Sequence, residues 1–315
     1  MKKFMKRSAI LAAGLILSGL IISLISISRV GMSRIDEVVA QSTDGRIHMN
    51  LNPLGDAFGV YMDEAGFSVN DGSKDLPMDS DRKIYKGDVE KIHLGNEVSN
   101  LWIDMEIGDL ICLPSEDRDF AIEAKEAGRL QAYVEDNTLY IKVAKDKKKT
   151  NYQTKVTLYV PSDVVFDTVE ADMGAGNLQF GKINTNDMNV YLGAGDFTVE
   201  ELRGEDLNFE IGMGNVQISR LNASDLQADV GMGNFEMHGT IHDRAKLECG
   251  MGDLKLWLEG QETDYNYEID AAMGNVTIGE QSYGGLSKSK TIDHDADKNL
   301  KLQCGLGNLE IHFVE

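Results

Sequence analysis

Residues 206–221 read Asp206-Leu207-Asn208-Phe209-Glu210-Ile211-Gly212-Met213-Gly214-Asn215-Val216-Gln217-Ile218-Ser219-Arg220-Leu221. On both sides of the Gly-Met-Gly-Asn tetrapeptide, apolar residues alternate with polar ones, as in two strands that each bury one face. Glycine and asparagine tolerate the backbone angles of a tight bend. The stretch therefore predicts two β-strands joined by a sharp corner.

The corner recurs along the chain. Five copies follow one another at a constant period of about 19 residues, and two looser copies follow after longer steps. A constant period of this size is typical of a solenoid, in which each repeat is one turn stacked on the last. We assign a structural turn motif to the following glycine and Asn/Asp positions: Gly174, Gly176, Asn177, Gly193, Gly195, Asp196, Gly212, Gly214, Asn215, Gly231, Gly233, Asn234, Gly250, Gly252, Asp253, Gly274, Asn275, Gly305, Gly307 and Asn308.

Equivalent positions of stacked repeats should form columns. One inward column would contain Cys249 and Cys304 with one further repeat between them, which places their Cα atoms about 9.6 Å apart, too far for a disulfide. All three cysteines, including Cys112, are interpreted as small buried apolar residues. The residue inside each corner, such as Met213, is expected to point inward because alternation continues from Ile211. The alternative is an exposed methionine stripe that docks a partner.

The N-terminus predicts a membrane anchor. Residues 1–7 are basic and residues 8–28 contain no charge, and about 20 apolar residues span a bilayer as a helix. The run is longer than the core of a secretory signal and has no convincing cleavage site, so an uncleaved helix is favoured over a cleaved signal. The basic excess before the span predicts a single-pass protein of the cell membrane, with a cytoplasmic N-terminus and an extracytoplasmic bulk.

The predicted fold class is an all-β solenoid, or β-helix, with rungs of about 19 residues, preceded by one N-terminal transmembrane helix. Residues 106–110, Glu-Ile-Gly-Asp-Leu, resemble a degenerate early rung, and the final strand, residues 309–314, is a candidate end cap. The predicted parts are a cytoplasmic tail (1–7), a transmembrane helix (8–28), a linker or N-terminal cap (29–83), strands leading into the solenoid (84–163) and the regular repeats (164–315).

The net charge of −21 excludes nucleic acid as the expected partner, because phosphate binding needs clustered Lys and Arg. No cofactor and no catalytic residues are predicted. The one weak metal candidate is a calcium loop at Asp293, Asp295 and Asp297. It lacks the glycine at the sixth position (Lys298) and the glutamate at the twelfth (Cys304), so a solvated insertion between the last two repeats is the alternative.

Residues 158–162, Leu-Tyr-Val-Pro-Ser, are followed by residues 168–178, Thr-Val-Glu-Ala-Asp-Met-Gly-Ala-Gly-Asn-Leu, and by the serial corners. This combination resembles a bacterial family of β-strand-repeat proteins, a domain of unknown function whose members are often labelled "putative adhesins". The resemblance covers about residues 85–315. It implies an envelope-associated protein of Gram-positive bacteria, sometimes linked to envelope-stress systems, and it brings no catalytic residues.

We therefore expect a non-enzymatic, membrane-anchored, extracytoplasmic protein that presents an acidic surface to an unknown protein or glycan of the cell envelope. One alternative is an envelope-stress sensing or regulatory protein that acts through a membrane partner, because seven residues before the span are too few for an output domain. A second is a carbohydrate-active β-helix enzyme, for which Asp187, Asp206 and Asp225 form an outward ladder of carboxylates. The first five repeats lack the long loops that a cleft would need.

Overall fold

The computed structural model describes residues 40–43, 46–50, 59–63, 66–70, 76, 78–115, 117–146 and 154–314. The chain divides into two units, Met1–Gly72 and Ser73–Glu315, which are described separately. In the first unit, four strands form an antiparallel sheet in chain order: β1 (Ala40–Thr43), β2 (Arg46–Asn50), β3 (Gly59–Asp63) and β4 (Gly66–Asn70).

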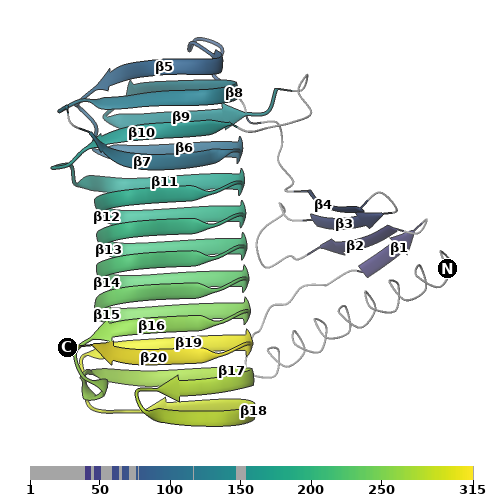
Figure 1. The fold of residues 1–315 in the computed structure, drawn as a ribbon, viewed down its shortest axis with the longest axis vertical. Helices are drawn as coiled ribbons and strands as arrows, with labels where there is room; N and C mark the ends of the chain where they lie inside the picture. The colour runs from purple at the N-terminus through teal and green to yellow at the C-terminus, as the bar shows by residue number, and fades with distance from the viewer. Residues whose placement is uncertain are drawn as a thin grey trace. The chain divides into compact units, whose positions relative to one another are not determined.

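The centre of the second unit is a stack of long parallel strands, which Figure 1 shows as successive layers. They are β12 (Leu178–Ala194), β13 (Phe197–Met213), β14 (Val216–Met232) and β15 (Phe235–Met251). Partners on neighbouring strands are one repeat apart in the sequence, as in the pair Phe209 and Ala228. The first half of β12 pairs with β7 (Asp109–Ser115) and its second half with β11 (Phe166–Ala175). Each long strand therefore contributes to two arms of the stack.

The two halves of a long strand face each other across the core. Phe197 and Phe209 both belong to β13, and in a straight strand their separation along the chain would place them about 40 Å apart. Their ring centroids are only 5.0 Å apart, and both side chains are fully buried. Burial of each such side chain contributes on the order of 2 kcal/mol. The core lies between the arms, and the intervening residues of each arm face outward.

The second glycine of each corner is required by the stacking. Gly195 and Gly214 have φ angles of +140° and +145°, which side chains rarely adopt. A Cβ atom on Gly214 would lie 1.8 Å from the carbonyl oxygen of Gly195. The polar corner residues form the expected side-chain ladder: Asp196 Oδ1 accepts hydrogen bonds from the backbone N–H of Asn215 at 2.8 Å and from its side-chain amide at 2.9 Å.

The residue inside the corner does not point inward. Met232 is 37% exposed and Met273 is 48% exposed, and the other members of this column are half-buried. The inward prediction is wrong because it assumed that strand alternation continues through the corner, where the chain turns. The column is a partly exposed apolar stripe.

Antiparallel strands close the N-terminal end of the stack. The early rung expected at residues 106–110 is confirmed, because Gly108 has a φ of +135° and its N–H donates to the carbonyl of Ala175 at 3.0 Å. Beyond this rung, β8 runs antiparallel to β9 and β10, and β5 pairs with β8. The strands here are β5 (Tyr85–Gly95), β6 (Asn100–Ile107), β8 (Phe120–Glu135), β9 (Thr138–Ala144) and β10 (Lys155–Pro161).

The C-terminal layers stack out of chain order. Here lie β16 (Leu254–Glu259), the short 3-10 turn η1 (Glu262–Asp264), β17 (Tyr265–Ile278), β18 (Gln281–Ile292), β19 (Lys298–Leu306) and β20 (Leu309–Val314). β19 lies between β15 and β17, and β20 lies between β16 and β17. Cys304 is therefore a direct neighbour of Cys249, not two rungs away. The final strand is internal, and β18, antiparallel to β17, occupies the position expected for a cap.

These findings correct the predicted fold class, an all-β solenoid of about 19-residue rungs preceded by one N-terminal transmembrane helix. The described chain is all-β, but its 16-stranded sheet mixes parallel and antiparallel strands, and the in-order stacking extends only from β11 to β16. A repeat period fixes which residues occupy a corner. It does not fix the layer in which a later copy lies. The segments that connect the last two copies to the preceding ones are longer than one repeat, so the chain can continue in a layer that is not the adjacent one.

The predicted membrane span, residues 8–28, lies outside the described residues. In the part of the chain that the structure describes, no helix is long and apolar enough to cross a membrane. The predicted location, a single-pass membrane protein with a cytoplasmic N-terminus and an extracytoplasmic bulk, depended on such a helix and is corrected by this finding.

Candidate binding groove

A groove of about 830 Å³ runs along the outer face of the arm that contains the second halves of the long strands. Its first row of side chains, the acidic column, consists of Asp187, Asp206 and Asp225, which are register partners on β12, β13 and β14. A second row, the amide column, lies two residues further along the same strands and consists of Asn189, Asn208 and Gln227. Neighbouring members of a column are about 4.8 Å apart, the spacing of paired strands.

The chain itself supplies one cation to the acidic column. Arg244 follows Asp225 in register on β15, and its guanidinium donates two hydrogen bonds to that carboxylate, Nε to Oδ1 at 3.1 Å and Nη2 to Oδ2 at 2.6 Å. These bonds hold the pKa of Asp225 below its usual value. Such paired bonds fit a planar guanidinium to a carboxylate. Asp187 and Asp206 are exposed.

The side-chain oxygen of Asn208, in the amide column, is an unsatisfied hydrogen-bond acceptor. Its Oδ1 atom is buried and has no hydrogen-bond partner, a situation it shares with Asn184 Oδ1 among the described side chains. A buried acceptor without a partner costs about 1–3 kcal/mol. The groove therefore includes a polar position that the fold leaves unsatisfied.

Basic residues at the far end of the groove are paired within the chain. Lys246 Nζ lies 2.8 Å from Glu248, and Lys301 Nζ lies 2.8 Å from Glu268. Exposed ion pairs of this kind contribute about 0–1 kcal/mol each. Their main effect is on charge, because this end of the groove is close to neutral while the acidic column is negative.

A further row of acids, the outer column, lies beside the amide column and includes Asp104, Glu210 and Asp229. Burial raises the pKa of Asp229 to about 6, assisted by the charges of Glu248 and Glu210. Burial raises the pKa of Asp104 to about 6 as well, with Asp172 as the next cause. Neither Asp104 nor Asp229 lines the groove.

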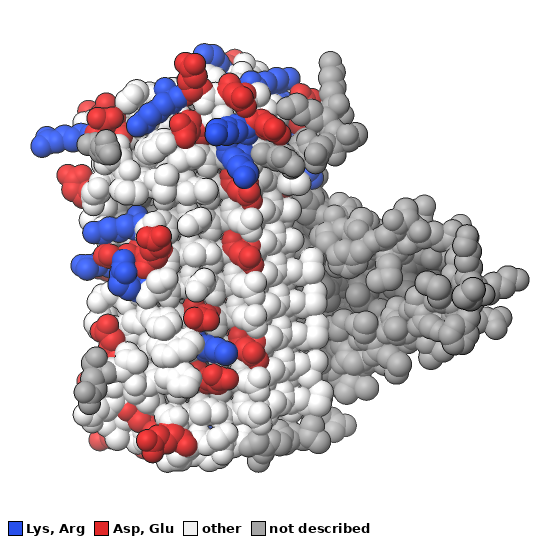
Figure 2. Space-filling view, in the orientation of Figure 1, with Lys and Arg blue, Asp and Glu red and all other residues white. Residues whose placement is uncertain are grey.

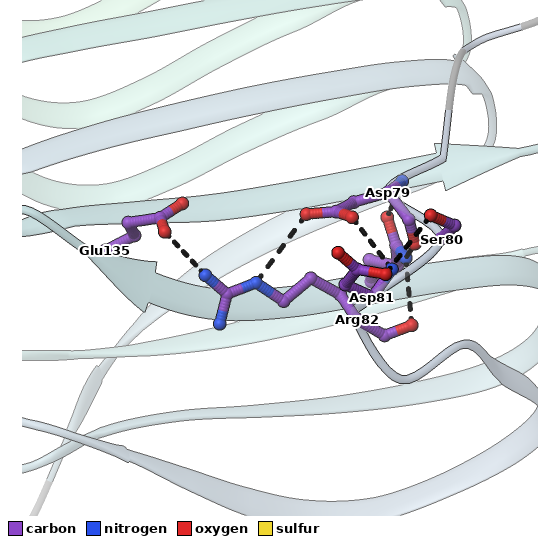
Figure 3. A network of polar contacts seen from close by, with 6 residues as sticks. Asp79, Ser80, Asp81, Arg82 and Glu135 are labelled. Carbon is purple, nitrogen blue, oxygen red and sulfur yellow. Dashed lines mark hydrogen bonds and ion pairs between the residues drawn. The ribbon is translucent and has the colours of Figure 1, made fainter.

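An aromatic stack continues the line of the amide column toward the N-terminal end of the fold. Tyr133 and Tyr140 stack with ring centroids 5.1 Å apart, and Tyr140 lies 6.3 Å from Trp102. The Arg82 guanidinium covers Tyr133 at 4.7 Å. Figure 3 shows how this arginine is held, with Nη2 at 2.6 Å from Glu135 and Nε at 3.7 Å from Asp79. Trp102, at the other end, is 39% exposed.

Figure 2 shows the charge pattern on one face of the molecule. Side chains of both signs crowd over the strands at the N-terminal end, β5 to β10, whereas acidic side chains stand among uncharged ones over much of the stacked strands. A basic cluster is confined to one edge of that face. The described surface is thus not uniformly acidic, and its charge varies from strand to strand.

The Toastrack DUF4097 family matches residues 98–279 and, in a second overlapping match, residues 166–311. The chain belongs to this family. The two Toastrack matches together include the early rung, all the glycine corners and the groove columns. No match was found among curated proteins.

Several solved structures are similar to this Toastrack chain at low identity. A "putative adhesin" from Bacteroides fragilis has 16% identity and a TM-score of 0.40, and the match covers 74% of this chain and 97% of that one. A "putative lipid binding protein" from Parabacteroides distasonis has 17% identity and a TM-score of 0.39, with 72% and 96% covered. A "putative cell adhesion protein" from Clostridium sporogenes has 11% identity and a TM-score of 0.30, with 74% and 100% covered.

Some of the candidate residues predicted from the sequence lie together in the Toastrack fold, and others do not. The fold brings Asp187, Asp206 and Asp225 together as neighbours. The calcium candidate forms a turn in which the N–H of Asp295 donates to Asp293 Oδ1 at 2.9 Å. Within the described residues, no group of three or more His, Cys, Asp or Glu side chains is arranged to hold a metal ion.

Sequence reasoning missed Trp102, Tyr140 and Arg244. Trp102 and Tyr140 meet because β6 pairs with β9, and nothing in the repeat period predicts that pairing. Arg244 could have been found, because it occupies the next position of the same periodic series as the acidic column.

Proposed function

We propose that this Toastrack protein is a non-enzymatic binding protein of the adhesin type, which engages a protein or glycan of the cell envelope through the groove. The observation that carries the proposal is the acidic column, in which Asp187 and Asp206 are exposed in register on neighbouring strands. A column of like groups at a constant spacing suits an elongated partner that makes the same contact several times.

The rigidity of the groove supports binding. Every outward side chain of the column stands on a strand that is hydrogen-bonded to a strand on each side, and the Asp196–Asn215 ladder ties consecutive corners. A surface that is already ordered loses little conformational entropy when it binds. Binding energy from modest polar contacts is therefore retained as affinity.

One observation favours a carbohydrate-active enzyme as the second candidate. Asp229 has a pKa near 6, which suits a general acid, and its neighbours Glu210 and Glu248 supply further carboxylates. Glycosidase chemistry needs two carboxylates that flank a bound sugar. Because Asp229 lies outside the groove, the geometry supports binding better than hydrolysis.

The proposal is tested by co-sedimentation of the full-length protein with purified envelope preparations, at low and at physiological salt. We expect binding that weakens with salt and that falls in the double variant Asp187→Asn/Asp206→Asn. The matched control Glu97→Gln/Asp117→Asn removes two exposed charges outside the groove and should bind like the wild type. Equal binding by both variants, or release of reducing ends from envelope polysaccharide, would contradict the proposal.

A further inference from the structure

We propose that the groove face recognises an extended basic peptide segment of a partner protein, which lies along the stacking direction and places one cationic side chain at Trp102 and another on the acidic column. This inference rests on the proposed function, since it specifies the partner that the same face would bind. Two places in the molecule where the chain binds its own cations carry the argument.

The first place is the end of the acidic column. Arg244 shows that a guanidinium on the neighbouring layer reaches an aspartate of this column with two hydrogen bonds. Asp187 and Asp206 occupy the same column in the same register, and the next layer offers each of them another aspartate instead of an arginine. A guanidinium from a partner would find the same geometry there.

The second place is the aromatic stack. At one end, Tyr133 carries Arg82 on its face, with Glu135 as the carboxylate that holds the guanidinium. At the other end, the exposed Trp102 is followed in register by Glu170 on β11. An indole face is the best aromatic partner for a cation. The two ends are thus alike in chemistry, and the Trp102 end is exposed to a partner.

The spacing of the layers selects the conformation of the peptide. Trp102 lies on β6 and Asp187 on β12, with β11 between them, so the two positions are about 9.6 Å apart along the stack. They are also offset by two residues across it, since Trp102 pairs with Glu170 and Asp187 with Thr168. This offset of about 6.6 Å is within the reach of a long arginine side chain. In a polyproline II segment, side chains three residues apart point the same way at about 9.3 Å. In a β-strand, the corresponding side chains are about 6.6 Å apart. A polyproline II segment with a basic residue at every third position therefore matches the layers.

A fluorescence anisotropy titration of the full-length protein with labelled peptides tests this inference. The spaced peptide is three Pro-Pro-Arg triplets, and the clustered peptide has the same composition with its three arginines adjacent. We expect the spaced peptide to bind about tenfold more tightly than the clustered one, because only its arginines match the layer spacing. Equal affinity for the two peptides would overturn the inference.

Substitutions on the acidic column and at Trp102 show which side chains contact the peptide. Asp187→Asn/Asp206→Asn should weaken the spaced peptide about tenfold, since the cation on the acidic column loses both exposed carboxylates. Glu97→Gln/Asp117→Asn should change the affinity by less than about twofold. Trp102→Ala should weaken binding about threefold or more and Trp102→Phe should retain most of it, with melting curves to verify folding. Equal losses in the charge variants, or displacement of the peptide by a neutral oligosaccharide, would overturn the inference.

The two proposals fail separately. If envelope material binds through the acidic column and the spaced peptide does not bind, the basic-peptide inference is wrong and the proposed function stands. If neither binds, both are wrong.

Discussion

The two halves of the groove differ in whether the charged side chains of their outward columns are paired within the chain. Over β12 and β13, the columns carry the exposed carboxylates of Asp187 and Asp206. Over β15, β19 and β17, they carry charges that the chain pairs with one another, as in Lys301 with Glu268. One half presents its charge to the solvent, and the other half neutralises its charge within the molecule.

This division coincides with the way the layers stack. The exposed acids lie on strands that follow one another in chain order. Internal pairing begins with Arg244 on β15, which binds Asp225, and continues where β19 enters between β15 and β17. Strict repetition places like charges next to each other, which costs stability unless a partner or solvent screens them. The regular half is therefore suited to binding and the irregular half to closure of the fold.

The largest effect is expected at a corner of the regular half. Gly214→Ala would place a methyl group 1.8 Å from the carbonyl oxygen of Gly195 at a φ of +145°, so we expect a loss of more than about 4 kcal/mol in the free energy of unfolding. The control is Gly181→Ala, whose new Cβ would meet its nearest neighbour at 3.5 Å. Urea unfolding of both variants measures the difference; similar losses would show that the corners do not limit the stacking.

The second prediction concerns the position of β19 next to β15, out of chain order. Because Cys249 and Cys304 are register partners on neighbouring strands, oxidation should join them, and closing this loop should stabilise the protein by about 4 kcal/mol. Cys112, which lies on β7 beside Leu158, should stay reduced. Peptide mapping by mass spectrometry identifies the linked pair. If stacking followed chain order, the two thiols would be too far apart and no link would form.

A smaller effect is expected from the outer column. The pKa of Asp229 is raised to about 6 in the fold and is near 3.9 in an unfolded chain, so the fold binds the proton more tightly and loses stability as pH rises from about 4 to about 6. Asp229→Asn should remove this loss and gain about 1 kcal/mol at pH 7, a value reduced because the group is partly exposed. Melting curves across this pH range compare the variant with the wild type. An unchanged pH profile in the variant would count against a buried, protonated Asp229.

The sequence predicted the local parts of this fold better than the long-range ones. The corner glycines and the polar ladder follow from residue type and period alone, and the early rung at Gly108 follows from the likeness of residues 106–110 to the corner motif. The position of β19 does not, because its apolar pattern fits a place between β15 and β17 as well as a place beyond β17. The direction of Met232 was also missed, since alternation fails where the chain turns.

The candidate site shows the same limit. The acidic column could be predicted because its members recur at the same position of three consecutive repeats. The aromatic stack could not, because Tyr133, Tyr140 and Trp102 come from strands whose pairing no repeat specifies.

The most direct measurement compares Arg244→Ala with Arg220→Ala in the titration with the spaced basic peptide. Both variants remove one exposed cation, but Arg244 occupies Asp225 in the acidic column, while Arg220 lies 3.6 Å from Glu201 outside the groove. If the acidic column binds a partner's cations, Arg244→Ala frees a third carboxylate and should tighten binding about three- to fivefold relative to Arg220→Ala. Equal affinity in the two variants would contradict the account.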